Sequence, residues 1–217
     1  GEGDTSGVSQ EMRGEFLKWT QDSGLTGLIL LGHAGCGKSA VAKQAGETAG
    51  IPVIEFGLSA MKGSLVGQST ANMRAASAAV DALSDRNCLM IATCNRIDAL
   101  TPEIRRRFTL GTWFVDLPDE TERDGIWNLW MGRYKVAGDI PMSVGWTGGE
   151  IKSCCDIADR LGCSLVDASR YILPSCRSAA EQIESLRKGA AGRYLSASYD
   201  GAYRYEQAAT AGRRINV

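Results

Sequence analysis

The residues best suited to chemistry in this chain form a glycine-rich segment that ends in a lysine and a serine. It fits the pattern G-x-x-x-x-G-K-[ST] and reads Gly32-His33-Ala34-Gly35-Cys36-Gly37-Lys38-Ser39. Glycines let the backbone turn with its N–H groups pointing inward, where they can bind phosphate oxygens. An apolar run precedes the segment and a helical pattern follows it, so the positive N-terminal end of that helix adds to the site. The pattern predicts a phosphate-binding loop.

Two side chains at the end of this phosphate loop carry the predicted chemistry. Lys38 would reach the β- and γ-phosphates of a bound nucleotide, and the Ser39 hydroxyl would bind Mg²⁺. We include Ala40, the next residue, in the binding segment. His33 lies within the loop, and we expect its ring to point outward. The alternative is a chance glycine-rich turn, and the flanking strand and helix argue against it.

The elements that must position the loop alternate between strand and helix. The apolar run Leu25–Leu31 predicts a strand buried on both faces. Further strands are predicted at Pro52–Phe56, Cys88–Thr93 and Thr112–Asp116, and helices at Ser9–Asp22, Ser39–Ala49 and Ser69–Leu83. Such alternation implies parallel βαβ units and an α/β sheet with helices on both faces. Together with the phosphate-loop motif, it resembles the sheet of a P-loop NTPase.

Beyond Pro118 the strand signals stop, and a small all-helical unit is predicted. Its expected helices are Asp119–Tyr134, one from a capping box at Thr147 to about Leu161, one from Ser164 to Ile172, and Pro174–Lys188. We therefore divide the chain into an N-terminal segment (1–24), a nucleotide-binding core (25–117), a helical lid (118–188) and a tail (189–217). The tail is expected to pack on a neighbouring lid or to be loosely ordered.

Composition narrows the class of protein. The 217 residues carry a net charge of -1 and are 44% hydrophobic, which excludes a disordered chain and gives no global attraction to nucleic acid or anionic membrane. The apolar runs fall far short of the ~20 residues of a membrane span, and no leader segment is recognised. Seven cysteines without a C-x-x-C pair indicate reduced thiols, so we expect a cytoplasmic protein.

From Leu25 to Leu186 the sequence resembles the AAA+ ATPases, in particular the AAA clade of protein-remodelling machines. Besides the phosphate loop, the resemblance rests on a pore-loop region at Met61–Ser69, a sensor-1 strand at Ile91–Asn95, an arginine-finger segment at Leu100–Phe108 and a lid segment at Trp146–Ile151. The family's pore loop usually carries an aromatic residue that grips a polypeptide. This chain has Leu65 and Val66 there, which puts a threading grip in doubt.

The resemblance also implies roles for individual residues. Asn95 would position the attacking water, although an asparagine at the end of a strand can also merely satisfy a turn. Arg105 and Arg107 would act on the γ-phosphate of a neighbouring subunit, which implies a homo-oligomer, expected to be a hexamer. A solvated basic face is the alternative for these arginines. Gly148 and Gly149 would lie against the adenine and ribose of ATP.

One part of the family pattern is missing. Members carry four apolar residues followed by Asp-Glu on a strand before sensor 1, and this chain has no such run. A strand with its crossover helix would need roughly 30 residues, and they have no place between Leu83 and Cys88. Three explanations are open: the segment is missing from the sequence printed above, or the lineage lost it and takes its catalytic acid from elsewhere, or the chain binds nucleotide without hydrolysing it. Glu55 is the one carboxylate we nominate as a substitute, and capping of its strand is the alternative.

The leading hypothesis is an ATP-binding AAA+ module, an ATPase acting on the β–γ phosphoanhydride, that assembles as a ring and remodels a protein partner. A nucleotide-gated scaffold that binds ATP without efficient hydrolysis is the first alternative. A DNA-acting ATPase is the second, because the tail Arg193–Arg214 mixes arginines with tyrosines. Its net charge of about +2 makes nucleic acid the weaker partner, and no membrane partner is expected.

Overall fold

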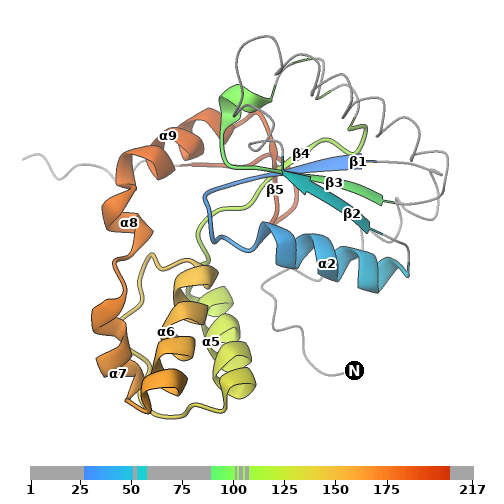
Figure 1. Ribbon diagram of the computed structural model, residues 1–217. Helices are drawn as coiled ribbons and strands as arrows, with labels where there is room; N and C mark the ends of the chain where they lie inside the picture. Colours follow the sequence, from blue (N-terminus) through green and yellow to red (C-terminus); the bar gives the residue numbers. More distant parts are fainter. Residues whose placement is uncertain are drawn as a thin grey trace, which may run out of the picture.

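A computed structural model describes residues 27–50, 53–57, 89–100, 102, 105 and 108–205 (Figure 1). Its centre is a five-stranded sheet with the strand order β2-β3-β1-β4-β5, in which every neighbouring pair is parallel. The strands are β1 (Gly27–Leu31), β2 (Val53–Gly57), β3 (Leu89–Cys94), β4 (Thr112–Phe114) and β5 (Leu195–Ser196). The predicted α/β fold with a parallel sheet is confirmed.

Strand β1 is the centre of the core, and its side chains alternate between the two faces of the sheet. Leu28 and Leu30 pack with Val41 and Ala42 of helix α2 (Lys38–Ala49), which covers one face. On the opposite face, Ile29 and Leu31 belong to a second buried cluster. All five residues of β1 are buried, as the continuous apolar run predicts for a central parallel strand.

The second face is covered by helix α9 (Ala180–Ala190) together with residues of the tail. Leu186 and Ala190 of α9 pack with Tyr194 and Tyr203 in the same cluster as β1 and β4. The short 3₁₀ helix η2 (Ile97–Ala99) follows β3 and borders this layer. The sheet therefore has a helical layer on each side.

Three helices form a separate group beside the sheet (Figure 1). These lid helices are α5 (Glu120–Tyr134), α6 (Gly148–Leu161) and α7 (Leu165–Ala168), and a 3₁₀ turn, η3 (Ser169–Tyr171), follows. Their core holds Trp127, Cys154 and Cys155, each at most 1% exposed. Both bonds of the predicted capping box at Thr147 are present: the hydroxyl of Thr147 accepts from the N–H of Glu150, whose carboxylate accepts from the N–H of Thr147.

The helix predicted over Pro174–Lys188 is wrong as a single element. The structure has helix α8 (Ser175–Ser178), a break at Ala179 and then α9. Ala179 has φ −130° and ψ 28°, outside the helical region. The break lets α9 leave the lid helices and pack against the sheet. The predicted lid (118–188) includes most of α9, and the structure places that helix on the sheet instead.

The expectation that the tail packs on a neighbour's lid, or lies loose, is wrong for residues 189–205. β5 extends the sheet beside β4, with Trp113 opposite Leu195 and Phe114 opposite Ser196. The expectation that strands stop at Pro118 fails for the same reason. Two residues give too short a pattern for a strand signal, and the contacts that order them come from distant parts of the chain.

Several predictions lie outside the described residues: the helices at 9–22 and 69–83, the pore-loop region with Leu65 and Val66, and Arg107. The described helices include none that is both long enough and apolar enough to cross a membrane. Of the seven cysteines, the six in the described part are free thiols.

Candidate nucleotide site

The phosphate loop connects the carboxyl end of β1 to the first turn of α2. Gly32 comes directly after β1 and packs against Val115, which comes directly after β4. A Cβ on Gly32 would overlap the carbonyl oxygen of Val115. Gly37 caps α2 with φ +94°, a left-handed conformation that glycine adopts without strain. The glycines at the two ends of the loop are thus required by space and by backbone conformation.

Lys38 is buried, at 8% exposure, and its ammonium group lies across the loop. It donates to the carbonyl oxygens of Gly32 at 2.9 Å and of His33 at 2.7 Å. Burial lowers the pKa of Lys38, and Cys36, Cys94 and Glu55 partly offset that shift. The positive charge is therefore held at the loop by its own backbone.

The hydroxyl of Ser39 donates to a carboxylate oxygen of Glu55 at 2.6 Å. Ser39 stands in the first turn of α2 and Glu55 in β2, so the contact joins the helix that starts the site to an edge strand of the sheet. Glu55 is exposed. An ionised carboxylate can only accept hydrogen bonds, so the hydroxyl proton is directed to Glu55.

A cavity of about 330 Å³ lies between the phosphate loop and the lid helices. Its lining from the loop and α2 runs from Gly35 to Val41, and the lid contributes Ile126, Trp130, Gly148, Gly149 and Lys152. Predicted residues from two distant segments, the phosphate loop and the Trp146–Ile151 segment, therefore meet in one cavity. The backbone N–H of Gly149 donates to the carbonyl oxygen of Gly35 at 3.0 Å, so the loop and the lid are in direct contact.

Asn95 lies in a second cavity of about 1020 Å³ on another side of the loop. His33 and Ala34 line it from the phosphate loop, and Gln182 and Ser185 line it from α9. Asn95 itself is exposed. The structure thus places Gly35 to Ala40 at the first cavity and His33, Ala34 and Asn95 at the second, whereas Gly32 lines neither of them.

Arg105 is exposed and lines neither of these two cavities. The other predicted arginine, Arg107, lies outside the described residues.

Two ionisable groups of the loop have shifted pKa values. Burial, reinforced by the Lys38 ammonium, lowers the pKa of His33 below its usual range, although Glu150 opposes the shift. Burial raises the pKa of the Cys36 thiol to about 12. Both side chains are therefore held in their neutral forms at neutral pH. Cys36 accordingly lacks the thiolate that nucleophilic chemistry requires.

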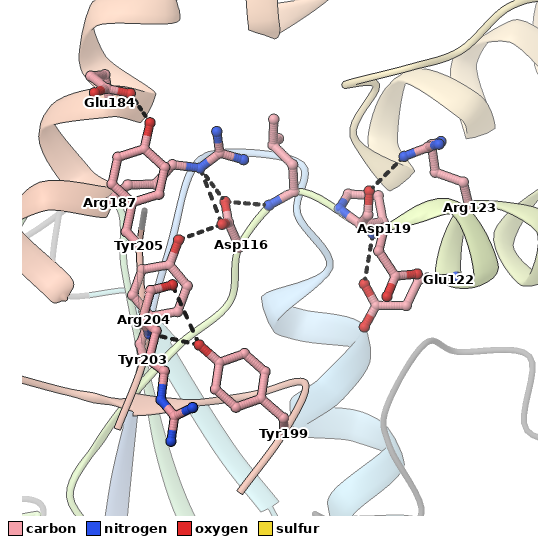
Figure 2. A network of polar contacts seen from close by, with 12 residues as sticks. Asp116, Asp119, Glu122, Arg123, Glu184, Arg187, Tyr199, Tyr203, Arg204 and Tyr205 are labelled. Atoms are coloured by element: carbon pink, nitrogen blue, oxygen red, sulfur yellow. Dashed lines mark hydrogen bonds and ion pairs between the residues drawn. The ribbon is translucent and has the colours of Figure 1, made fainter. Parts of the chain in front are cut away.

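Some residues of the first cavity were missed from the sequence. Asp116 follows β4, and its carboxylate accepts hydrogen bonds from Arg187 at 2.8 Å, from Tyr203 at 2.5 Å and from the N–H of Leu117 at 2.7 Å (Figure 2). A polar residue two positions after a strand, at the sheet edge where ligands of α/β proteins bind, is a signal that could have found Asp116. No sequence pattern points to the other missed lining residues, among them Glu122, Lys152 and Ser198.

Comparison with known proteins agrees with this geometry. The model of the family "ATPase family associated with various cellular activities (AAA)" matches residues 28–84. A crystal structure of the FIGL-1 AAA domain superposes with a TM-score of 0.57 at 14% identity, covering 84% of this chain and 86% of that one. The fold is that of an AAA domain. The predicted resemblance to the AAA+ ATPases is confirmed.

A second structure, the FIGL-1 AAA domain in complex with ADP, superposes on this chain with a TM-score of 0.56 at 16% identity, covering 87% of this chain and 91% of that one. No curated protein sequence matches the chain. At these identities the likeness concerns the fold, and the chemistry of the site rests on this chain's own residues.

Proposed function

We propose that this AAA domain binds ATP in the cavity between the phosphate loop and the lid helices. The loop amides and Lys38 would hold the phosphates, and the base end would lie toward Gly148 and Gly149. The observation that carries the proposal is the meeting of the phosphate-loop motif and the lid glycines in one cavity of about 330 Å³. That volume falls in the range of pockets that bury small ligands.

Magnesium fits the residues at the start of α2. Mg²⁺ prefers oxygen ligands, and the Ser39 hydroxyl stands beside the Glu55 carboxylate with 2.6 Å between their oxygens. Ser39 would hold the ion. When bound, the ion would neutralise charge on the β- and γ-phosphates.

The proposed reaction is hydrolysis of the β–γ phosphoanhydride of ATP in a ring, for which we infer six copies of this chain. Asn95 would orient the attacking water, and Arg105 and Arg107 would reach the γ-phosphate of a neighbouring subunit. The exposure of Arg105 supports this role, because an arginine that acts on a neighbour must leave its own core. The ring would remodel a protein partner.

Two measurements test the ring and the reaction. Sedimentation with ATP and Mg²⁺ should show a shift from monomer to a closed oligomer, and phosphate release should accompany it. Lys38→Ala should abolish both. Lys43→Ala is the matched control, because Lys43 lies on the same helix with its side chain 77% exposed. Protein that stays monomeric with ATP and Mg²⁺ would overturn the ring model.

A nucleotide-gated scaffold is the second candidate, because the chain has no run of four apolar residues followed by Asp-Glu. Removing one electrostatic group of this kind typically costs 10²–10³ in rate, whereas phosphate binding by the loop would survive. ATP binding without phosphate release would support the scaffold. Phosphate release that Lys38→Ala abolishes would reject it.

A DNA-acting ATPase is not favoured. Base stacking needs exposed rings. Tyr194 and Tyr203 of the tail are 8% and 4% exposed and pack in the core of the sheet, and Tyr199, at 37%, is the most exposed ring of the described tail.

A further inference from the structure

We infer that Glu55 is the carboxylate that positions Ser39 at the nucleotide site: it accepts a hydrogen bond from the Ser39 hydroxyl and so orients the Ser39 oxygen toward the magnesium ion of a bound Mg–ATP. The inference rests on the proposed ATP site and names the carboxylate that the missing acidic motif leaves unassigned.

The geometry of the hydroxyl is the first argument. A serine hydroxyl has one proton and two lone pairs. With its proton directed to Glu55, 2.6 Å away, the lone pairs of the Ser39 oxygen face away from that carboxylate. Ser39 also lines the cavity beside Lys38. A hydroxyl held in this way presents a lone pair to a cation without having to break a hydrogen bond.

The second argument is that the neighbouring acids of the described residues have other partners. Asp116 accepts from Arg187 and Tyr203. Glu122 accepts from the N–H of Asp119 at 3.0 Å and from the hydroxyl of Ser198 at 2.9 Å.

Glu150, the acid of the lid near the phosphate loop, is also occupied. It closes the capping box of α6 and accepts from both the N–H and the hydroxyl of Ser175 at 2.6 Å. Of the acids described around the loop, Glu55 is the one that contacts a phosphate-loop side chain.

The place of Glu55 in the sheet is the third argument. β2 pairs in parallel with β3, and β3 pairs in parallel with β1, so the carboxyl ends of all three strands lie at the edge from which the phosphate loop leaves. Glu55 lies opposite Ile91 of β3, which pairs with Leu28 of β1, and Glu55 stands two residues before the carboxyl end of β2. From there its carboxylate contacts the Ser39 hydroxyl in the first turn of α2. A side chain on a strand is held more rigidly than one on a loop, which suits a residue that must orient a ligand.

Glu55 is therefore a positioning residue, and its effect should depend on both magnesium and Ser39. Calorimetric titration of the full chain with ATP, with and without Mg²⁺, measures how far the ion strengthens binding. Loss of a partner that orients a metal ligand typically costs 10–100-fold in metal affinity. Glu55→Gln should reduce the strengthening by Mg²⁺ by about tenfold or more, and ATP affinity without the ion should change less than about twofold.

Glu47→Gln is the matched control, since Glu47 lies on α2 with its side chain 63% exposed and pairs with Lys43. It should behave as the unchanged protein does. A double-mutant cycle with Ser39→Ala isolates the coupling, because Glu55→Gln should have no further effect once the hydroxyl is gone. Binding of Mn²⁺ with ATP, followed by electron paramagnetic resonance, should weaken in parallel.

The outcomes separate the two proposals. An unchanged protein that binds no ATP overturns the proposed function and this inference with it. ATP binding that Mg²⁺ strengthens equally in the unchanged protein and in Glu55→Gln overturns the inference alone. So does a Glu55→Gln effect that persists in full on the Ser39→Ala background.

Discussion

Gly149 of the lid donates its backbone N–H to the carbonyl oxygen of Gly35 in the phosphate loop, and the two atoms lie 3.0 Å apart. A Cβ on Gly149 would come within 3.2 Å of the Gly35 Cα, and a Cβ on Gly35 within 2.8 Å of the Thr147 hydroxyl oxygen. The approach is this close because neither residue has a side chain. The position of the lid helices and the shape of the loop are consequently coupled at one backbone contact.

Gly35→Ala should destabilise the protein more than Gly37→Ala does. Both glycines have positive φ, +83° and +94°, so both variants carry a strain of about 1–2 kcal/mol. Only the Cβ at Gly35 meets another group, the cap of α6 at Thr147, whereas Gly37 has open space. We expect the free energy of unfolding in urea to fall by at least about 1 kcal/mol more in Gly35→Ala. Equal losses in the two variants would show that the lid does not rest on the loop.

Asp116→Asn should cost stability because it removes the charge that holds α9 and the tail to β4. The Asp116 and Arg187 side chains are each 25% exposed, and Tyr203 shares the carboxylate. We expect a loss of about 1–3 kcal/mol in the free energy of unfolding. Asp98→Asn breaks a more exposed pair with Arg96 and should cost less stability. A loss in Asp116→Asn no larger than in this control would contradict the role given to Asp116.

His33, the single histidine of the chain, should titrate below its usual pKa of about 6.5. The folded state binds the proton less readily than the unfolded state does. The resulting contribution to stability is present above pH ~6.5 and is lost as the pH falls from there through the folded-state pKa.

Proton NMR of the one imidazole measures this midpoint directly. In Lys38→Met the midpoint should rise, because the nearby positive charge is gone, yet stay depressed, because burial is the larger cause. A native midpoint at or above 6.5, or one that Lys38→Met leaves unchanged, would be inconsistent with the packing described for the loop.

Tyr203→Ala should be among the more damaging substitutions in the tail. The ring lies 4.4 Å from that of Phe114 between centroids, and the side chain is 4% exposed. We expect a loss of about 3–5 kcal/mol in thermal or urea unfolding. Tyr171→Ala, at a tyrosine that is 69% exposed, should change stability by less than about 0.5 kcal/mol. A mild effect at Tyr203 would mean that the tail is not part of the core.

The sequence predicts the elements whose signals are local. The buried run of β1, the phosphate loop and the capping box at Thr147 all depend on residues close together in the chain, and the structure has each of them. The sequence predicts the contact of Ser39 with Glu55 only in part. It indicates Glu55 as a candidate acidic residue but does not indicate that Glu55 binds Ser39. The partner of Glu55 depends on the pairing of β2 with β3, and sequence spacing does not reveal which strand pairs with β3.

The sequence does not predict the packing of the tail against the sheet, for a physical reason. β5 has two residues and no period of its own, and its place is set by Trp113 and Phe114, more than 80 residues earlier. The break at Ala179 was missed because alanine favours helix and the backbone departs from helix only where α9 turns to the sheet. Non-local contacts decide both features.

The insertion of residues 195–205 beside β4 also bears on how the protein is made. Synthesis delivers β1 and the phosphate loop first, whereas Ala197 and Ser198, which complete the cavity wall, leave the ribosome more than 150 residues later. In a nascent chain still lacking them, β4 is the edge strand among the described strands of the sheet. The cavity is thus assembled after translation of this segment, and interrupted translation products carry the motif without the finished pocket.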